Sequence, residues 1–470
     1  MTGSIRTADS QEVDMADDIR ADAETARAAA LALGQASGGE RNAALEAIAD
    51  ALEANAERIL EANRRDLAAA ERLVAEGKLT LALVKRLKVD EQTLHKEIAV
   101  GVRSVADQPE PIGRTLMATE LDEGLKLYRV SVPIGVIGVI FESRPDAMVQ
   151  IATLCLKSGN AVLLKGGSEA LRTNRVLAEV MRKATRGLPG IPEGWMHLLE
   201  AREEVRAILD LHDLIDLVIP RGGNELVQYI VANTKIPVMG HVDGICHVYV
   251  DSAADLKKAK RVCLDAKTQY TAACNAAETL LVHREIAEAF LPDMVRILRE
   301  NGVEVRGDEA TRKLGGEAVI AATEADWATE YLDQIVSVKV VNDLESAMDH
   351  INRYGSHHTD AIVTEDPSAA SGFLQGVDAA SVLHNASTRF ADGFRYGLGA
   401  EVGISTNRLH SRGPVGLEGL VIYKYIVEGE GQTVGEYSGE GARTFTHRPL
   451  SETWQPKGPV TSNRKTPGPA

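Results

Sequence analysis

Hydrophobic positions change their spacing along this chain, and each change marks a different kind of structure. Residues 16–87 are rich in alanine, and their apolar side chains recur at helical spacing. Residues 116–133 alternate between apolar and polar positions around a turn at Gly124, which predicts a β-hairpin. From Ile134 onward, short apolar runs alternate with amphipathic stretches, which indicates strands alternating with helices.

The alternating region predicts a parallel sheet. Its apolar runs predict strands at residues 134–141, 161–165, 195–199, 214–220 and 236–239. The stretches between them predict helices at residues 147–157, 168–185, 203–211 and 224–233. Continuous apolar strands joined by helices are typical of a parallel sheet covered on both faces, and such sheets bind ligands beyond the carboxyl ends of their strands.

A second strand–helix series begins near Asp255. It contains a loop of small residues at 268–277, followed by a predicted strand at 278–283. Residues 385–398 are rich in Gly, Asn, Ser and Arg, a composition typical of functional loops. We predict flexible tails at residues 1–14 and 440–470, where polar residues, Gly and Pro dominate. The pattern as a whole predicts the α/β fold class.

The composition adds limits on partners and location. The chain has 470 residues, 44% of them hydrophobic, and 52 Lys and Arg stand against 68 Asp and Glu, for a net charge of −16. This length is typical of two or three domains. This excess of acidic residues disfavours nucleic acid as a binding partner, because a phosphate backbone needs a basic surface. We expect no membrane span, since no apolar run approaches roughly 20 residues. Four scattered cysteines and a polar N-terminus predict reduced thiols in a cytoplasmic protein.

Cys274 is the candidate nucleophile. It lies in the run TAACNAAE, where small residues leave backbone N–H groups exposed and give little steric cover. A reactive thiolate needs such surroundings, and the N–H of Cys274 itself is placed to stabilise an oxyanion. From these residues alone, a buried and inert cysteine is the more common outcome. The remaining cysteines lie on apolar helix faces or in a predicted strand, which indicates core positions for Cys155, Cys246 and Cys263.

Two glycine-rich turns follow strands of the first sheet. Arg221-Gly222-Gly223-Asn224 opens a predicted helix, and glycines there allow a phosphate to approach free N–H groups at the helix N-terminus. Lys165 ends another strand, where its ammonium can hydrogen-bond a ribose. An ordinary strand-to-helix turn and a surface lysine explain the same residues, and a GxGxxG fingerprint is absent. Both interpretations stay open at this point.

Histidines and arginines in loops offer further chemistry. Adjacent His357 and His358 would point to opposite faces of a strand, and no third ligand stands at zinc spacing, so we predict no metal site. His241 and Asp243 lie between strands, where an acid–base role competes with a structural contact. Guanidinium groups in loops suit phosphate or carboxylate, although each alone is more often a salt-bridge partner. The arginines concerned are Arg144, Arg221 and Arg389.

Seven longer runs carry a family resemblance. They are PIGVIGVIFESRPDA (133–147), LLKGGSEA (163–170), VIPRGGNELV (218–227), HVDGICHVYVD (241–251), AACNAAETLLVH (272–283), YGSHHTDAIVTE (354–365) and NASTRFADGFRYGLGAEVGIST (385–406). In order and spacing they resemble the gamma-glutamyl phosphate reductases, a branch of the aldehyde dehydrogenase superfamily. The resemblance covers residues 20–430.

The resemblance implies a three-part, aldehyde-dehydrogenase-like architecture. It implies that Cys274 is the nucleophile and that a protruding β-flap pairs with a second subunit, so a homo-oligomer is expected. A separate glutamate kinase is a candidate partner. The implied parts are an NADP-binding domain with a Rossmann-like, five-stranded parallel sheet (15–115 and 134–254), an α/β catalytic domain (255–405) and the oligomerisation flap (116–133 and 419–428).

The same comparison separates this chain from acid-forming relatives. Oxidative aldehyde dehydrogenases carry an oxyanion-binding Asn where Ser143 aligns, and a Glu that activates water where His241 or its neighbour aligns. An enzyme that passes its thioester to hydride or to phosphate gains nothing from activated water. The resemblance therefore implies NADPH-dependent reduction of gamma-glutamyl phosphate to glutamate semialdehyde, through a Cys274 thioester, in proline biosynthesis.

Cofactor and substrate residues are inferred from the same alignment. NAD-preferring relatives often carry Glu where this chain has Ser168, and a hydroxyl can donate to the 2′-phosphate of NADPH, although the neighbouring Glu169 weighs against this preference. Asp333 aligns with the acidic residue that holds the nicotinamide ribose. The expected cofactor contacts are Lys165, Ser168, Arg221, Gly222, Gly223 and Asp333. The expected substrate and phosphate contacts are Ser143, Arg144, Asn385 and Arg389.

Three rival functions stay open on sequence grounds. An acid-forming aldehyde dehydrogenase would turn over without phosphate. A thiol hydrolase would need a histidine base near Cys274 and would not respond to a nucleotide. A non-catalytic homologue would not bind NADPH, although the intact Cys274 loop counts against it.

Overall fold

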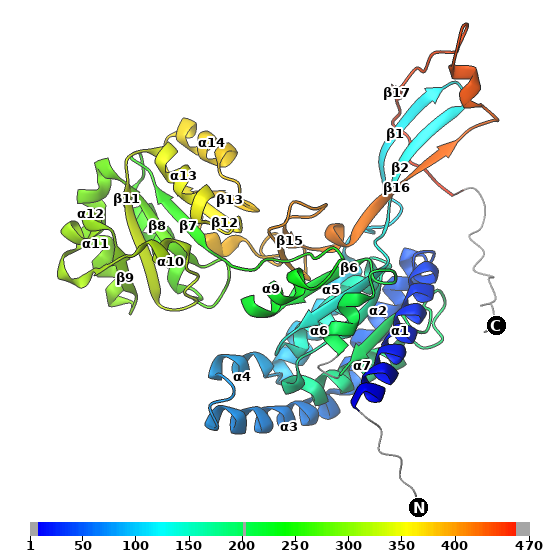
Figure 1. Ribbon diagram of the computed structural model, residues 1–470, viewed down its shortest axis with the longest axis horizontal. Coiled ribbons are helices and arrows are strands. Elements are labelled where there is room, and N and C mark those ends of the chain that lie inside the picture. Colours follow the sequence, from blue (N-terminus) through cyan, green and yellow to red (C-terminus); the bar gives the residue numbers. More distant parts are fainter. Residues whose placement is uncertain (1–7, 201–203, 457–470) are drawn as a thin grey trace, which may run out of the picture.

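The computed structural model describes residues 8–200 and 204–456, which form two α/β bodies and a projecting β-flap (Figure 1). The first body is built on a parallel sheet with the strand order β5-β4-β3-β6. The predicted fifth strand at 236–239 is reduced to a single bridge between Val218 and Val238. Pro237 interrupts this run, because it has no N–H to donate to a ladder. The strands are β3 (Val136–Phe141), β4 (Ala161–Lys165), β5 (Met196–Leu199) and β6 (Leu217–Arg221).

Helices cover both faces of this sheet, as the apolar strands predicted. Val139 and Ile140 are neighbours in β3, yet they pack into different hydrophobic clusters, because successive side chains of a strand point to opposite faces. On one face lie α1 (Ala8–Leu33), α8 (Glu204–Asp210) and α9 (Asn224–Ala232). On the other lie α2 (Gly38–Ala54), α3 (Ala56–Ala75), α5 (Ala99–Asp107), α6 (Pro145–Lys157) and α7 (Leu171–Thr185).

The second body contains a seven-stranded parallel sheet in the order β10-β9-β11-β8-β7-β12-β13. Because β7 belongs to this sheet, the boundary between the bodies falls before Cys246 and not at residue 255 as predicted. A continuous apolar strand does not reveal which sheet it joins. The strands are β7 (Cys246–Val250), β8 (Ala277–His283), β9 (Glu304–Gly307), β10 (Ile320–Ala321), β11 (Ile335–Val341), β12 (Thr359–Val363) and β13 (Ser381–His384). The helices are α10 (Leu256–Thr268), α11 (Arg284–Glu300), α12 (Glu309–Gly315), α13 (Leu344–Tyr354) and α14 (Pro367–Gly376).

A buried ion pair links two elements of the second body. Lys267 near the end of α10 donates to Glu278 at the start of β8, with 2.6 Å between Nζ and Oε2. Burial raises the pKa of Glu278 to about 7, and the neighbouring ammonium opposes that rise. The pair joins both ends of the short connection that carries Cys274.

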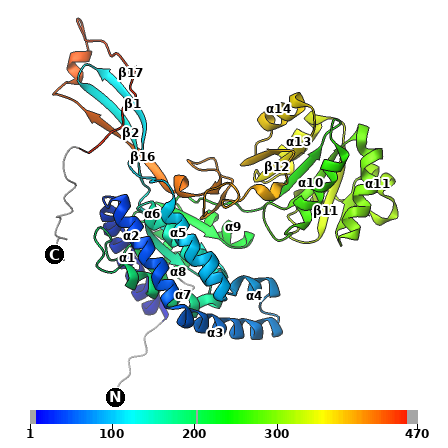
Figure 2. The same ribbon diagram turned by 180° about the vertical axis from the view of Figure 1, so that it is seen from behind.

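The flap is an antiparallel sheet with the strand order β16-β2-β1-β17, and it projects away from both bodies (Figures 1 and 2). The predicted hairpin forms β1 and β2, and the predicted late strand forms β16. A small sheet of β14 and β15 lies between the two bodies (Figure 1). The strands are β1 (Thr115–Asp122), β2 (Leu125–Pro133), β14 (Gly403–Ser405), β15 (Gly413–Val415), β16 (Val421–Glu428) and β17 (Arg448–Pro449).

Both predicted tails contain ordered structure. Helix α1 begins at Ala8, so residues 8–14 are helical. Residues 1–7 lie outside the described residues. At the other end, β17 pairs with β1, and the Trp454 indole donates to Glu428 at 3.2 Å. Leu450 and Trp454 provide apolar contacts with the flap that their Gly- and Pro-rich surroundings do not suggest. Residues 457–470 lie outside the described part.

Helices of the described residues were also compared with the length and apolarity of a membrane span. Within residues 8–200 and 204–456, no helix is both long and apolar enough to cross a bilayer.

The oligomerisation role of the flap stays a prediction, and its exposed edge strand β16 suggests how to test it. Tyr423, Tyr425 and Val427 lie on one face of β16, with 50%, 57% and 57% of their surface exposed. A Tyr425→Glu/Val427→Glu double variant should lower the molar mass in light scattering, because it places charge on an apolar contact face. Lys424→Glu, on the opposite face, is the control. An unchanged mass in the double variant would contradict the role of the flap.

Candidate active site

The two bodies face each other across a cavity of about 410 Å³. From the first body, the turns that follow β3 and β6 line it. From the second body, the turn that precedes β8 lines it, and the small sheet β14–β15 closes a further side. The cavity therefore lies at the carboxyl edge of the first sheet, as predicted for a parallel sheet, and at the amino edge of the second.

Cys274 lies in the turn between α10 and β8 and lines this cavity. Its thiol is half-buried, whereas the other three cysteines are buried. Burial raises the pKa of Cys155, Cys246 and Cys263, which keeps those thiols protonated. Cys274 is therefore the cysteine that a ligand in the cavity can reach, as the small residues around it predicted.

A glycine fixes the turn that carries Cys274. A Cβ atom added to Gly244 would lie 2.0 Å from the Cys274 carbonyl oxygen and 2.6 Å from its Cα, so only glycine fits there. The Cys246 thiol donates to the same carbonyl oxygen at 3.2 Å. The segment that leads into β7 is thus packed against the backbone of the nucleophile.

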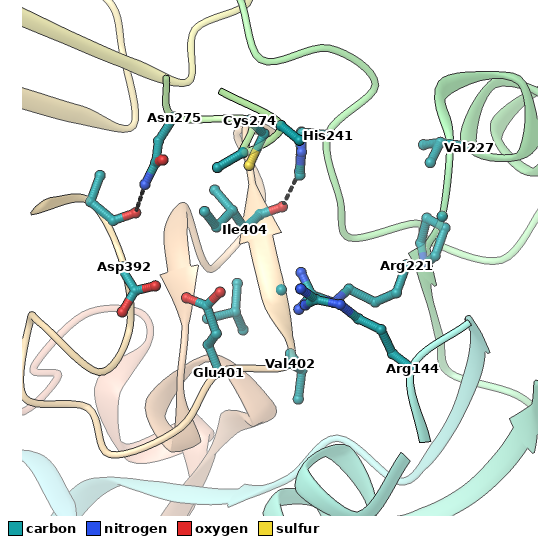
Figure 3. Close-up of a pocket in the computed structure, with 18 of the residues that line it drawn as sticks. Arg144, Arg221, Val227, His241, Cys274, Asn275, Asp392, Glu401, Val402 and Ile404 are labelled. Carbon is teal, nitrogen blue, oxygen red and sulfur yellow. Dashed lines mark hydrogen bonds between the residues drawn. The ribbon is translucent and has the colours of Figure 1, made fainter. Parts of the chain in front are cut away.

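His241 lies beside Cys274. Its Nδ1 is 2.9 Å from the carbonyl oxygen of Ile404, a contact that fixes the orientation of the ring (Figure 3). One ring nitrogen of His241, one of His358 and the Cys274 Sγ all lie within 4.8 Å of one another. Burial lowers the pKa of His241, so the imidazole is neutral near pH 7 and able to accept a proton.

Five arginines line the cavity together with four carboxylates, those of Glu142, Glu330, Asp392 and Glu401. Arg144 follows β3 and Arg221 is the last residue of β6, and their side chains reach toward Glu401 below Cys274 (Figure 3). The Arg221 Nε is buried and has no hydrogen-bond partner within the described part of the chain, which leaves a donor for an anionic ligand. The full set is Arg86, Arg144, Arg221, Arg389 and Arg395.

The glycines after β6 allow the Glu142 carboxylate to approach the N-terminus of α9. The N–H of Gly223 donates to the carboxylate of Glu142 at 2.9 Å. A Cβ atom on Gly222 would lie 2.6 Å from the same carboxylate and 2.7 Å from Leu226. This helix end therefore binds an anionic group in the structure itself, which is the property predicted for a phosphate site.

Three predicted cofactor residues do not line the cavity. Lys165 is buried at the end of β4, and its ammonium donates to the carbonyl of Gly166. Ser168 lies in the short helical turn that follows. Asp333 is exposed and accepts a hydrogen bond from the N–H of Gln334 at 2.7 Å. Their contacts with a cofactor stay predictions.

Two predicted substrate residues are engaged elsewhere. Ser143 is buried in a left-handed conformation with a φ of 44°, and its hydroxyl donates to Glu169 at 2.6 Å. Asn385, with a φ of 55°, donates to the carbonyl of Thr364 at 2.9 Å. Neither is among the residues that line the cavity, in contrast to Arg144 and Arg389.

Sequence reasoning missed several residues of the site. His358 was interpreted as lacking a third ligand nearby, because only spacing along the chain was considered. Arg395 and Glu401 lie inside the run 385–406, whose composition already suggested a functional loop. Arg86 lies near the end of a helix in the first body, and its local sequence does not indicate a role in the site.

Comparison with known proteins agrees with this arrangement. Residues 4–336 match the model of the aldehyde dehydrogenase family. The chain is 56% identical to the gamma-glutamyl phosphate reductase of Haloquadratum walsbyi, over 95% of this chain and 98% of that protein. It is 56% identical to that of Methanococcoides burtonii, over 93% and 98%. The crystal structure of gamma-glutamyl phosphate reductase from Thermotoga maritima matches with a TM-score of 0.84 and 43% identity, over 88% and 98%.

The identities and coverages are high enough to assign the family. The chain belongs to the aldehyde dehydrogenase family, in its gamma-glutamyl phosphate reductase branch. The predicted resemblance and fold class are therefore confirmed.

Thiol accessibility predicts selective alkylation. Iodoacetamide at neutral pH should add one group to the native protein, at Cys274, because the other three thiols are buried and have a raised pKa. Peptide mass spectrometry identifies the site, and Cys274→Ser should take up no label. Labelling of Cys246 at a comparable rate would contradict this assignment.

Proposed function

We propose that this chain reduces L-glutamyl 5-phosphate to L-glutamate 5-semialdehyde with NADPH and releases inorganic phosphate. The observation that carries the proposal is a reachable thiol, with His241 beside it, in a cavity lined by five arginines. An acyl phosphate and the leaving phosphate are both anions, which guanidinium groups bind. The aldehyde product would cyclise to 1-pyrroline-5-carboxylate, a step of proline biosynthesis.

The names of the relatives support the same substrate. Proteins that are 53–57% identical to this chain over most of its length are named gamma-glutamyl phosphate reductase. The substrate would be supplied by a glutamate kinase, whether or not that enzyme docks here.

In the proposed first step, the Cys274 thiol loses its proton to a neighbouring base, and His241 is the residue placed to accept it. The thiolate attacks C5 of the substrate, and the backbone N–H of Cys274 stabilises the oxyanion. The bond between C5 and the phosphate oxygen then breaks. Phosphate leaves with the electron pair of that bond, and Arg144, Arg221 and Arg389 are the residues that we expect to bind it. A thioester on Cys274 results.

NADPH, when bound, supplies the hydride that reduces the thioester carbon. We expect its phosphates to bind at the N-terminus of α9 in place of the Glu142 carboxylate, which accepts the Gly223 N–H in this structure. Lys165 and Ser168 are the proposed contacts to the adenosine side. After reduction, the Cys274 N–H again stabilises the oxyanion, and the carbon–sulfur bond breaks to release the aldehyde and the Cys274 thiolate.

The reverse reaction tests the proposal without the unstable acyl phosphate. With 1-pyrroline-5-carboxylate and NADP⁺, NADPH absorbance should rise only when inorganic phosphate is present, because the thioester needs phosphate as its acceptor. NAD⁺ in place of NADP⁺ tests the coenzyme preference. Cys274→Ser should lower the rate by at least about 10³-fold, since the nucleophile is lost. Equal rates without phosphate would favour the acid-forming dehydrogenase instead.

The arginines of the lining predict a specific loss of phosphate binding. Arg221→Gln should raise the KM for phosphate in the reverse reaction about 10- to 100-fold, because it removes a charged donor from a half-buried site. Arg299→Gln, an exposed arginine on α11, is the matched control. An unchanged KM for phosphate in Arg221→Gln would remove this residue from the phosphate site.

A further inference from the structure

Three residues far apart in sequence bring metal-binding atoms together at the active site. Cys274 comes from the turn before β8, His241 from the segment before β7, and His358 from the position directly before β12. Strands β8, β7 and β12 are neighbours in the second sheet, so their amino ends lie side by side. One sulfur and two ring nitrogens from these residues lie within 4.8 Å of one another.

The hydrogen bonds of the two histidines leave one nitrogen of each ring available. The Nδ1 of His241 is held by the Ile404 carbonyl oxygen at 2.9 Å, which leaves its Nε2 free to coordinate. The Nδ1 of His358 is 2.8 Å from the Thr359 hydroxyl. The Nε2 of His358 is buried and has no partner among the described residues, although buried ring nitrogens normally have one. This nitrogen is therefore available to a ligand.

We propose that Cys274, His241 and His358 form a binding site for a thiophilic divalent cation of the Zn²⁺ type, which blocks the nucleophile reversibly. A thiolate with two imidazoles is a ligand set that Zn²⁺ takes in proteins, with a fourth position open to water. Binding replaces the thiol proton with a metal–sulfur bond, and the proton passes to the solvent. The thiolate electron pair is then no longer available to attack a carbonyl.

The geometry is close to that of a tetrahedral site. Ligand atoms around tetrahedral Zn²⁺ lie roughly 3.5 Å apart, so the three atoms must approach one another by up to about 1.3 Å, which side-chain rotation can supply. The hydrogen bonds on both Nδ1 atoms are the outer contacts that orient histidine ligands in metal sites.

Charges around the site limit its affinity. Arg221 and Arg389 line the same cavity and oppose a cation, whereas Glu330 and Glu401 line it and offset them. We therefore expect reversible binding, weaker than at structural zinc sites.

Cobalt spectroscopy tests the site on the full-length chain after removal of bound metal with a chelator. Co²⁺ should produce visible tetrahedral bands and a near-ultraviolet sulfur-to-metal band, and Zn²⁺ should displace both. Cys274→Ser should lose the sulfur band. His241→Ala and His358→Ala should each weaken Co²⁺ binding at least about 100-fold, because loss of a direct ligand exceeds the 10- to 100-fold effect of an outer contact. His358→Gln repeats the test with a side chain closer in size.

The neighbouring histidine is the matched control. The His357 side chain is 42% exposed, and its Nδ1 lies 2.7 Å from the Asp378 carbonyl oxygen, away from Cys274. His357→Ala should keep both the Co²⁺ spectrum and the enzymatic rate. Equal Co²⁺ affinity in His358→Ala and the unaltered protein, or absence of the sulfur band at millimolar Co²⁺, would overturn the proposal.

The spectra do not depend on turnover. Absent bands together with phosphate-dependent NADPH formation would refute the metal site alone. Bands in a protein that forms no NADPH would support the metal site and refute the proposed function. Only the predicted inhibition rests on that function.

Discussion

The site depends on one close backbone contact, between Gly244 and Cys274. Any side chain at position 244 would collide with the carbonyl group of the nucleophile, so this glycine allows the segment between the two bodies to cross the Cys274 turn. That crossing sets His241 beside the thiol and brings the carboxyl edge of the first sheet opposite the amino edge of the second. The buried pair Lys267–Glu278 holds the other side of the same turn.

Charge is distributed unevenly between the surface and the site. The chain carries a net charge of −16, yet its cavity contains five arginines. Four carboxylates line the same cavity, so an anion is bound by individual guanidinium groups and not by a strongly positive field. Arg144, after β3, and Arg221, at the end of β6, provide such groups beside the region expected to bind the cofactor.

The errors of sequence interpretation share a cause. Strand β7 was assigned to the wrong body, and a fifth strand was expected around Pro237, because an apolar run reports burial but not its neighbours in a sheet. The polar composition of the tails predicts flexibility, yet Trp454 and Leu450 pack against the flap. Spacing along the chain does not identify His358 as a ligand, because its partners are remote in sequence.

What the sequence by itself determined is the alternation of strands and helices, the small-residue turn around Cys274, the glycines that open α9 and, through seven specific runs, the family. These are local features, since each depends on residues adjacent along the chain. Only the tertiary structure decided that His241 and His358 lie beside Cys274, that Arg86 and Arg395 share one cavity with Arg144, and that Ser143 is bound to Glu169. Those relations depend on the order of strands within a sheet and on how two sheets face each other, which spacing along a chain does not specify.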